Sequence, residues 1–226
     1  MWLILFGFIA YVLIFALAAG SWQKRKLNLG GRALRSGMTG HEVARRILED
    51  NGVEVVPVRR AREPELARFE VGRRRLALGS DIHDGTNLFA VLSAAHAAVQ
   101  ALPGTVAEPA GRWRRSVVSF GHTGAGAIIM TLIVVAIFRP IVWRLVLPAW
   151  LLLGVLLLLG HLSSLSWEYR LADRAVAELR RLGVIGISEE DDCAALAKAL
   201  PLRDIRGVGE SVRRFLGALL PFKGWR

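Results

Sequence analysis

The sequence predicts a mainly α-helical membrane protein with three transmembrane helices and a small α+β cytoplasmic domain. The first observation behind this class is composition, because hydrophobic residues make up 53% of the 226 residues and the mean hydropathy is +0.40. The second is the presence of three apolar stretches, at 2–20, 117–138 and 145–165, each near the length of about 20 residues that crosses a bilayer. The third is a mixture of helix-like and strand-like patterns between the first two stretches.

Basic residues beside the apolar stretches predict how the chain is oriented. Cationic flanks stay in the cytoplasm by the positive-inside rule, although Arg139 and Arg144 in the short external link go against it. We expect an anchor at 1–20, a cytoplasmic domain at 21–116, two transmembrane helices within 117–166 and a C-terminal cytoplasmic helical region at 167–226. The flanks used are Lys24, Arg25 and Lys26, then Arg112, Arg114 and Arg115, and finally Arg170 and Arg174.

The charge balance is strongly basic, with 30 Lys and Arg against 19 Asp and Glu and a net charge of +11. Such an excess is typical of nucleic-acid-binding proteins, but membrane orientation explains it more simply and predicts membrane lipids, not nucleic acid, as partners. A membrane-surface or nucleic-acid binder remains an alternative, and it predicts binding that weakens steeply with salt. Cys193 is the only cysteine, which excludes an internal disulfide and a thiolate zinc site.

The cytoplasmic domain begins with a helix that has a clear start signal. Thr39 and Glu42 have the spacing of a capping box, in which each side chain bonds the other residue's backbone. The helix is expected to run to about Asn51, and Gly52 can end it.

Strand patterns follow this helix. Residues 53–58 are rich in β-branched side chains. Residues 66–71 and 74–78 flank Gly72 and predict a β-hairpin.

Residues 87–102 predict a helix that is buried within the cytoplasmic domain. Pro103 and Gly104 end it, and it is too short and too rich in small side chains for a membrane span. His96 lies close to its apolar stripe. The stripe recurs at helical spacing and consists of Leu88, Leu92, Ala95, Val99 and Leu102.

The C-terminal region predicts three further helices. The first covers 167–182, and the second has Ser188 as its N-cap and ends at Pro201. The third covers 208–219 and is amphipathic, with basic residues off its apolar face. This pattern predicts either a helix that lies on the membrane surface or one that packs against the domain.

The buried helix contains an incomplete metal-binding motif. In the pattern H-E-x-x-H, two histidines one helical turn apart hold zinc, and the glutamate between them activates the bound water. His96 occupies the first histidine position, whereas Ala97 replaces the glutamate and Gln100 replaces the second histidine. The segment is therefore a degenerate zincin-like helix.

The surrounding sequence resembles a known family, the neutral zinc metallopeptidases of bacterial membranes (YugP-like). Residues 36–48, SGMTGHEVARRIL, closely resemble the signature that follows the first span in that family. Residues 94–96 resemble the entry to its zinc helix, and residues 167–175 resemble a later conserved segment of the type P-V-E-F-x-A-S-x-R-A. The order and spacing agree over roughly residues 1–195.

The resemblance implies a zinc site and assigns residues to it. His96 carries over as a metal ligand, and Glu168 carries over as the downstream acidic ligand. It also implies a bacterial membrane protein, and together with the basic flanks it predicts a multi-pass protein of the inner membrane with most of its chain in the cytoplasm. Without the resemblance, His96 is a buried helix histidine and Glu168 is a carboxylate paired with Arg170 or another arginine.

We expect an inactive homologue of these peptidases, a pseudopeptidase with a binding or regulatory role and an active homologue as one candidate partner. The expected chain holds no cofactor. The alternative is an active zinc metallopeptidase with altered ligands, for which Asp81, His83 and Asp84 are further donors just before the zinc helix. Two imidazole or carboxylate ligands hold zinc less well than three, and loss of a general base costs about 10²–10⁴ in rate.

Overall fold

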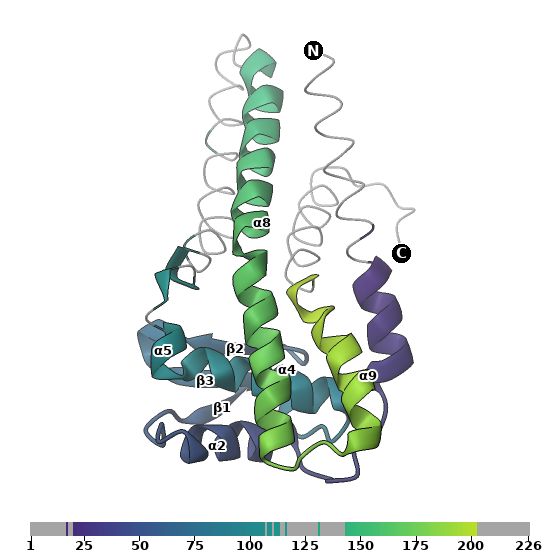
Figure 1. The fold of residues 1–226 in the computed structure, drawn as a ribbon. Coiled ribbons are helices and arrows are strands. Elements are labelled where there is room, and N and C mark those ends of the chain that lie inside the picture. Colours follow the sequence, from purple (N-terminus) through teal and green to yellow (C-terminus); the bar gives the residue numbers. More distant parts are fainter. Residues whose placement is uncertain are drawn as a thin grey trace. The chain divides into compact units, whose positions relative to one another are not determined.

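The computed structural model describes residues 17, 20–106, 108–109, 111–113, 116, 131 and 143–202, with only some of the side chains of 143–164 included. The chain divides into two compact units. One contains 21–112 and 165–201, and the other contains 1–20, 113–164 and 202–226. The described chain is mainly helical and has a single small three-stranded sheet, as predicted for an α+β domain (Figure 1).

Within the described residues, no helix combines the length and the apolar character of a membrane span. The predicted spans at 2–20 and 117–138 lie outside the described residues apart from single positions, and so does the predicted helix at 208–219. The predicted span at 145–165 falls in the first part of α8, Trp143–Arg181, where many side chains also lie outside the description.

The sheet has the strand order β1-β3-β2. The hairpin prediction is confirmed, because β2 (Ala67–Glu70) and β3 (Arg75–Gly79) pair antiparallel on either side of the short helix η2 (Val71–Arg73). β1 (Val58–Ala61) pairs parallel with β3. The strand signal at 53–58 was therefore misplaced, because Val53 donates its N–H to Leu48 O and the chain turns before the strand begins.

Helix α2 (Gly40–Asp50) has the predicted capping box. The Glu42 N–H donates to Thr39 Oγ1 at 3.3 Å, and the Thr39 N–H donates to Glu42 Oε2 at 2.7 Å. The first residue, Gly40, lies very close to its neighbours, since a Cβ there would lie 2.1 Å from Ile82 O and 3.1 Å from Ala94 Cβ. A glycine is required at this point, where α2 meets α3 (Ser80–His83) and α4 (Leu88–Ala101).

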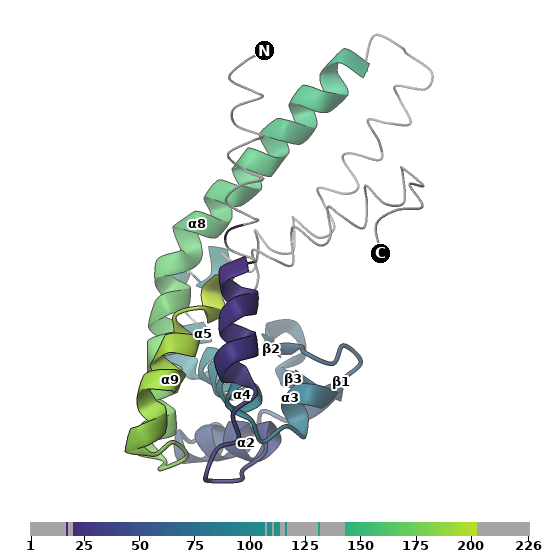
Figure 2. The same cartoon turned by 90° about the vertical axis from the view of Figure 1, so that its right-hand side faces the viewer.

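Helix α4 (Leu88–Ala101) forms the centre of its unit. The Asn87 side chain caps it by accepting from the Ala90 N–H at 2.9 Å, and every residue of the helix except Gln100 is buried. It is packed against by helices α2, α3 and α9 (Ile187–Ala197) and by strand β2 (Figure 2). The prediction of a buried helix is confirmed, but its apolar surface extends around the whole helix and is not confined to one stripe.

The C-terminal described helices agree in part with their predictions. The helix at 167–182 is confirmed as the second part of α8. Helix α9 (Ile187–Ala197) begins two residues earlier than predicted, because Gly186 is the N-cap and donates its N–H to Glu189 Oε2 at 2.8 Å. The predicted cap, Ser188, was therefore wrong, and the helix ends before Pro201.

The only cysteine of the chain lies on the inner face of α9. Cys193 has no exposed surface. Burial, and to a smaller extent the charge of Glu189, raises the pKa of its thiol to about 12. The thiolate form is therefore scarce at neutral pH, and the side chain serves as a small apolar residue.

Candidate functional site

The structure brings His96 and Glu168 together, although 72 positions separate them in the chain. His96 lies on α4 and Glu168 on α8, and each residue is only 3% exposed. Nε2 of His96 is 3.2 Å from Oε2 of Glu168, which is within ion-pair distance. The approach does not meet hydrogen-bond geometry, and Nε2 has no hydrogen-bond partner among the described residues. The two side chains that the family resemblance assigned as metal ligands therefore face each other in the interior.

Gln100 lies on the other side of the His96 ring. Its side-chain nitrogen is 3.5 Å from Nδ1 of His96, and its side-chain oxygen accepts a long hydrogen bond from the Phe69 N–H at 3.5 Å. Gln100 thus links α4 to strand β2 and can orient the imidazole. Because it approaches Nδ1, it does not share a position with Glu168 beside Nε2.

Two further residues of α4 complete the local picture. Ala97 is fully buried, and its methyl group offers no proton acceptor. Ser93 is buried, and its hydroxyl has no hydrogen-bond partner among the described residues. Residues three apart share a helix face, so Ser93 lies on the same side of α4 as His96. Ser93 was not predicted from the sequence, although a lone hydroxyl in an apolar helix, one turn before His96, is a signal that could have indicated it.

A family model described as "putative neutral zinc metallopeptidase" matches residues 4–202, which is most of the chain. The chain belongs to this family. Comparisons with curated proteins and with solved structures give no match. The resemblance found in the sequence is thereby confirmed at the level of the family. The metallopeptidase family implies a zinc ion, so the residues around His96 can be tested against what zinc requires.

The described residues supply only part of a catalytic zinc site for this metallopeptidase homologue. Two donors bound to one tetrahedral zinc ion lie roughly 3.3 Å apart, so the 3.2 Å between His96 Nε2 and Glu168 Oε2 suits two ligands of one ion. Catalytic zinc sites have three protein ligands and a water. Among the described residues, no group of three or more His, Cys, Asp or Glu side chains could hold a metal. The described donors alone therefore do not complete a catalytic zinc site.

The additional donors considered in the sequence form a separate cluster. Nδ1 of His83 is 2.6 Å from Oδ1 of Asp84, and the His83 ring packs on the His41 ring with centroids 4.5 Å apart. Asp81 accepts a hydrogen bond from the Ser80 hydroxyl at 3.0 Å. These contacts explain the local structure of α3 without a metal.

The charges of this cluster influence one another. Burial, followed by the nearby His83, lowers the pKa of His41 below its ordinary value of 6.5. The hydrogen bond with His83, assisted by Arg60, lowers the pKa of Asp84. Arg60 contacts the Asp84 carboxylate at 2.5 Å. At neutral pH the neutral form of His41 is thus favoured beside an ionised Asp84.

Aromatic packing fixes the part of α8 that carries Glu168. The Trp167 indole N–H donates to Glu108 Oε2 at 2.7 Å, and Arg170 contacts the same carboxylate. A Cβ at Gly111 would lie 2.6 Å from the Trp167 ring, so only a glycine allows this approach. Trp167 and Arg170, on either side of Glu168 in the chain, are therefore held by the segment that follows α5 (Pro103–Val106).

Proposed function

We propose that this chain is a catalytically inactive member of the neutral zinc metallopeptidase family, a pseudopeptidase with a binding or regulatory role. The observation that carries the proposal is the position of Gln100. It occupies the place of the second motif histidine, yet its amide approaches Nδ1 of His96 and bonds the Phe69 N–H. Among the described residues, Glu168 is then the only side chain of a metal-ligating type within ion-pair distance of His96 Nε2.

The chemistry of the remaining position supports the same conclusion. Ala97 stands where the family motif has its general base, and a methyl group cannot accept a proton from water. Loss of a general base alone costs about 10²–10⁴ in rate. An amide in place of an imidazole also weakens metal binding, because neutral amide oxygen is a poor zinc ligand. Both changes act on the same step, so peptide hydrolysis is lost.

We also propose a multi-pass location in a bacterial inner membrane, with most of the chain in the cytoplasm. The support is in the sequence, where three apolar stretches have basic flanks. Membrane lipids are then direct partners. For a regulatory role, the candidate partners are an active homologue or another membrane protein.

The test is to purify the full chain with zinc present, then measure metal per chain by mass spectrometry and hydrolysis of casein. We expect much less than one zinc per chain and no hydrolysis above that of His96→Ala. One tightly held zinc per chain, together with hydrolysis that His96→Ala abolishes, would overturn the proposal.

A second candidate function is an active zinc metallopeptidase with altered ligands. It is favoured by the His96 Nε2 atom, which is buried and lacks a hydrogen-bond partner among the described residues. This candidate predicts that Glu168→Ala or His83→Ala removes bound zinc, whereas Glu63→Ala, which changes an exposed carboxylate, leaves it in place. Equal metal content in all three variants would reject it.

A further inference from the structure

Strand β1 has an outer side that no strand of the described residues pairs with, because β3 lies on its other side. The Leu76 N–H donates to Pro57 O at 3.0 Å, and Val58 is in register with Leu76. In a parallel ladder successive residues alternate in direction, so the backbone of Arg59 faces β3. The backbone groups of Val58 and Arg60 therefore face away from β3, and no described strand pairs with them.

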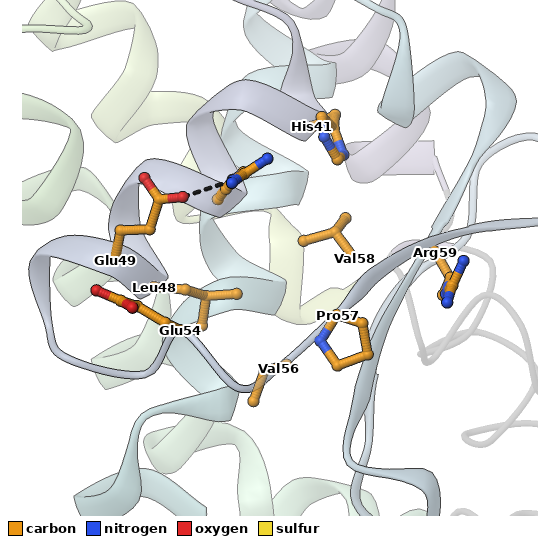
Figure 3. A pocket seen from close by; sticks show the side chains of 9 residues that line it. His41, Leu48, Glu49, Glu54, Val56, Pro57, Val58 and Arg59 are labelled. Carbon is orange, nitrogen blue, oxygen red and sulfur yellow. Dashed lines mark hydrogen bonds and ion pairs between the residues drawn. The ribbon is translucent and has the colours of Figure 1, made fainter.

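A pocket of about 570 Å³ lies between α2 and the start of this strand (Figure 3). Its size is within the usual range of roughly 300–1,000 Å³ for ligand pockets. An extended chain added to a sheet edge directs every second side chain to the same face. A side chain of such a chain can therefore enter the pocket. The apolar lining is Leu48, Val56, Pro57 and Val58, and the polar lining is His41, Arg45, Glu49, Glu54 and Arg59.

The charges at the pocket favour an acidic ligand. Arg45 is already paired with Glu49 at 2.5 Å, as the dashed line in Figure 3 marks. Arg59 is exposed and has no ion-pair partner among the described residues, and Arg62, also exposed, follows the same strand. Glu54 is the one acidic side chain of the lining that lacks a described ion pair, and Glu63 follows Arg62. The segment 54–75, which forms most of the sheet, is nevertheless basic, with seven arginines and four glutamates.

His41 adds a polar group to the apolar part of the pocket. In Figure 3 its ring lies beside Val58, at the edge of the space that Leu48 and Pro57 border. Its Nδ1 is buried and has no hydrogen-bond partner among the described residues. Because Nδ1 is covered, a ligand in the pocket meets other atoms of the ring.

We propose that the β1 edge and this pocket bind an extended acidic peptide segment of a partner protein. The peptide pairs with the outward backbone groups of Val58 and Arg60, which is the β-augmentation mode of peptide recognition. An apolar side chain of the peptide enters the pocket, and its acidic neighbours contact Arg59 and Arg62. The pocket shares no lining residue with the His96 site, so this proposal does not depend on the state of the metallopeptidase motif.

The competing explanation is that Arg59 and Arg62 prevent other chains from pairing with the edge of β1. Charged side chains on an edge strand commonly prevent unwanted pairing. That explanation predicts no saturable peptide binding at all, whereas the pocket and the unpaired cations predict selective binding.

The test is fluorescence polarisation of the full-length chain in detergent micelles. The probe is an end-capped, fluorescein-labelled heptapeptide with a central phenylalanine between acidic residues. We expect saturable binding that Arg59→Glu weakens about tenfold or more. Arg68→Glu makes the same charge change on the opposite edge strand, β2, and is expected to change the affinity less than about twofold. Val58→Pro removes an outward N–H without removing the bond of Leu76 to Pro57, and it should weaken binding as well.

Two further peptides test the backbone pairing directly. Each carries N-methyl groups at every second amide, in one or the other register. Only the register whose methyl groups point toward β1 should lose binding. The proposal is overturned if no saturable binding occurs up to about 1 mM, if both arginine variants weaken binding equally, or if both methylated peptides bind alike.

Discussion

Helices α2 and α4 pack against each other but differ in how much of each helix is exposed to solvent. On α2 the buried residues form one face, and the remaining residues are partly or fully exposed. On α4 only Gln100 escapes burial. A polar side chain on α2 can turn to water, whereas Ser93 and His96 on α4 need partners within the protein. The two helices therefore differ in what a substitution does, because any side chain placed on α4 must fit the interior.

The largest expected effect comes from removing a core side chain of α4. Leu92 is fully buried, so Leu92→Ala should lower the free energy of unfolding by about 4 kcal/mol. Arg46→Ala on the exposed face of α2 is the control and should change it by less than about 0.5 kcal/mol. Urea titration followed by circular dichroism measures both. Equal effects would contradict the contrast between the two helices.

The next effect concerns the buried pair. Glu168→Ala removes the carboxylate that faces His96 and should lower the free energy of unfolding by about 2 kcal/mol, because the buried imidazole of His96 loses its ion-pair partner. The double variant with His96→Ala should cost less than the sum of the two single variants. The same urea titration forms the cycle. Additive costs would show that the two side chains do not interact.

A smaller effect is expected at the N-terminus of α2. Thr39→Ala removes the side chain that accepts from the Glu42 N–H and should cost about 1 kcal/mol. Thr39→Ser keeps the hydroxyl and should remain close to the parent in thermal melting. If the serine variant loses as much as the alanine variant, the capping box is not the reason for the loss.

The smallest effect is a pH dependence that originates in His41. Its pKa is lowered in the folded protein, so the folded state binds this proton less readily than the unfolded state does. Stability is complete above the ordinary value of 6.5 and decreases as the pH falls through it. The lowered pKa values of Glu42 and Asp84 act at more acidic pH. His41→Gln should therefore reduce the change in the urea midpoint between pH 7.5 and pH 5.5. If the midpoint of the variant changes with pH as much as that of the parent, His41 is not the source of the pH dependence.

Local signals predicted most of the described fold. Thr39 and Glu42 define the start of α2 by their own side chains, and Asn87 does so for α4. The start of β1 was missed, because a parallel partner lies far along the chain and no local residue encodes its register. The cap of α9 was missed for a different reason, since Glu189 reaches back to Gly186 and moves the start of the helix.

The candidate site was less accessible to sequence reasoning than the fold. The pairing of His96 with Glu168 was expected only through the family resemblance, because no spacing rule connects residues on two helices so far apart in the chain. Gln100 was identified as a replaced ligand, but the ring nitrogen that it approaches depends on the side-chain orientation of His96. The pocket at β1 was not predicted, because it forms only when α2 and the strand are brought together.

The inaccessible thiol of Cys193 makes the chain convenient for site-specific labelling. A maleimide dye reacts with the thiolate, which burial suppresses at this position. Arg62 is exposed, so the thiol introduced by Arg62→Cys would be the reactive group that carries the probe, and Cys193 would not need to be replaced. Fluorophores or spin labels attached there would follow the outer side of β1 as candidate peptides are added.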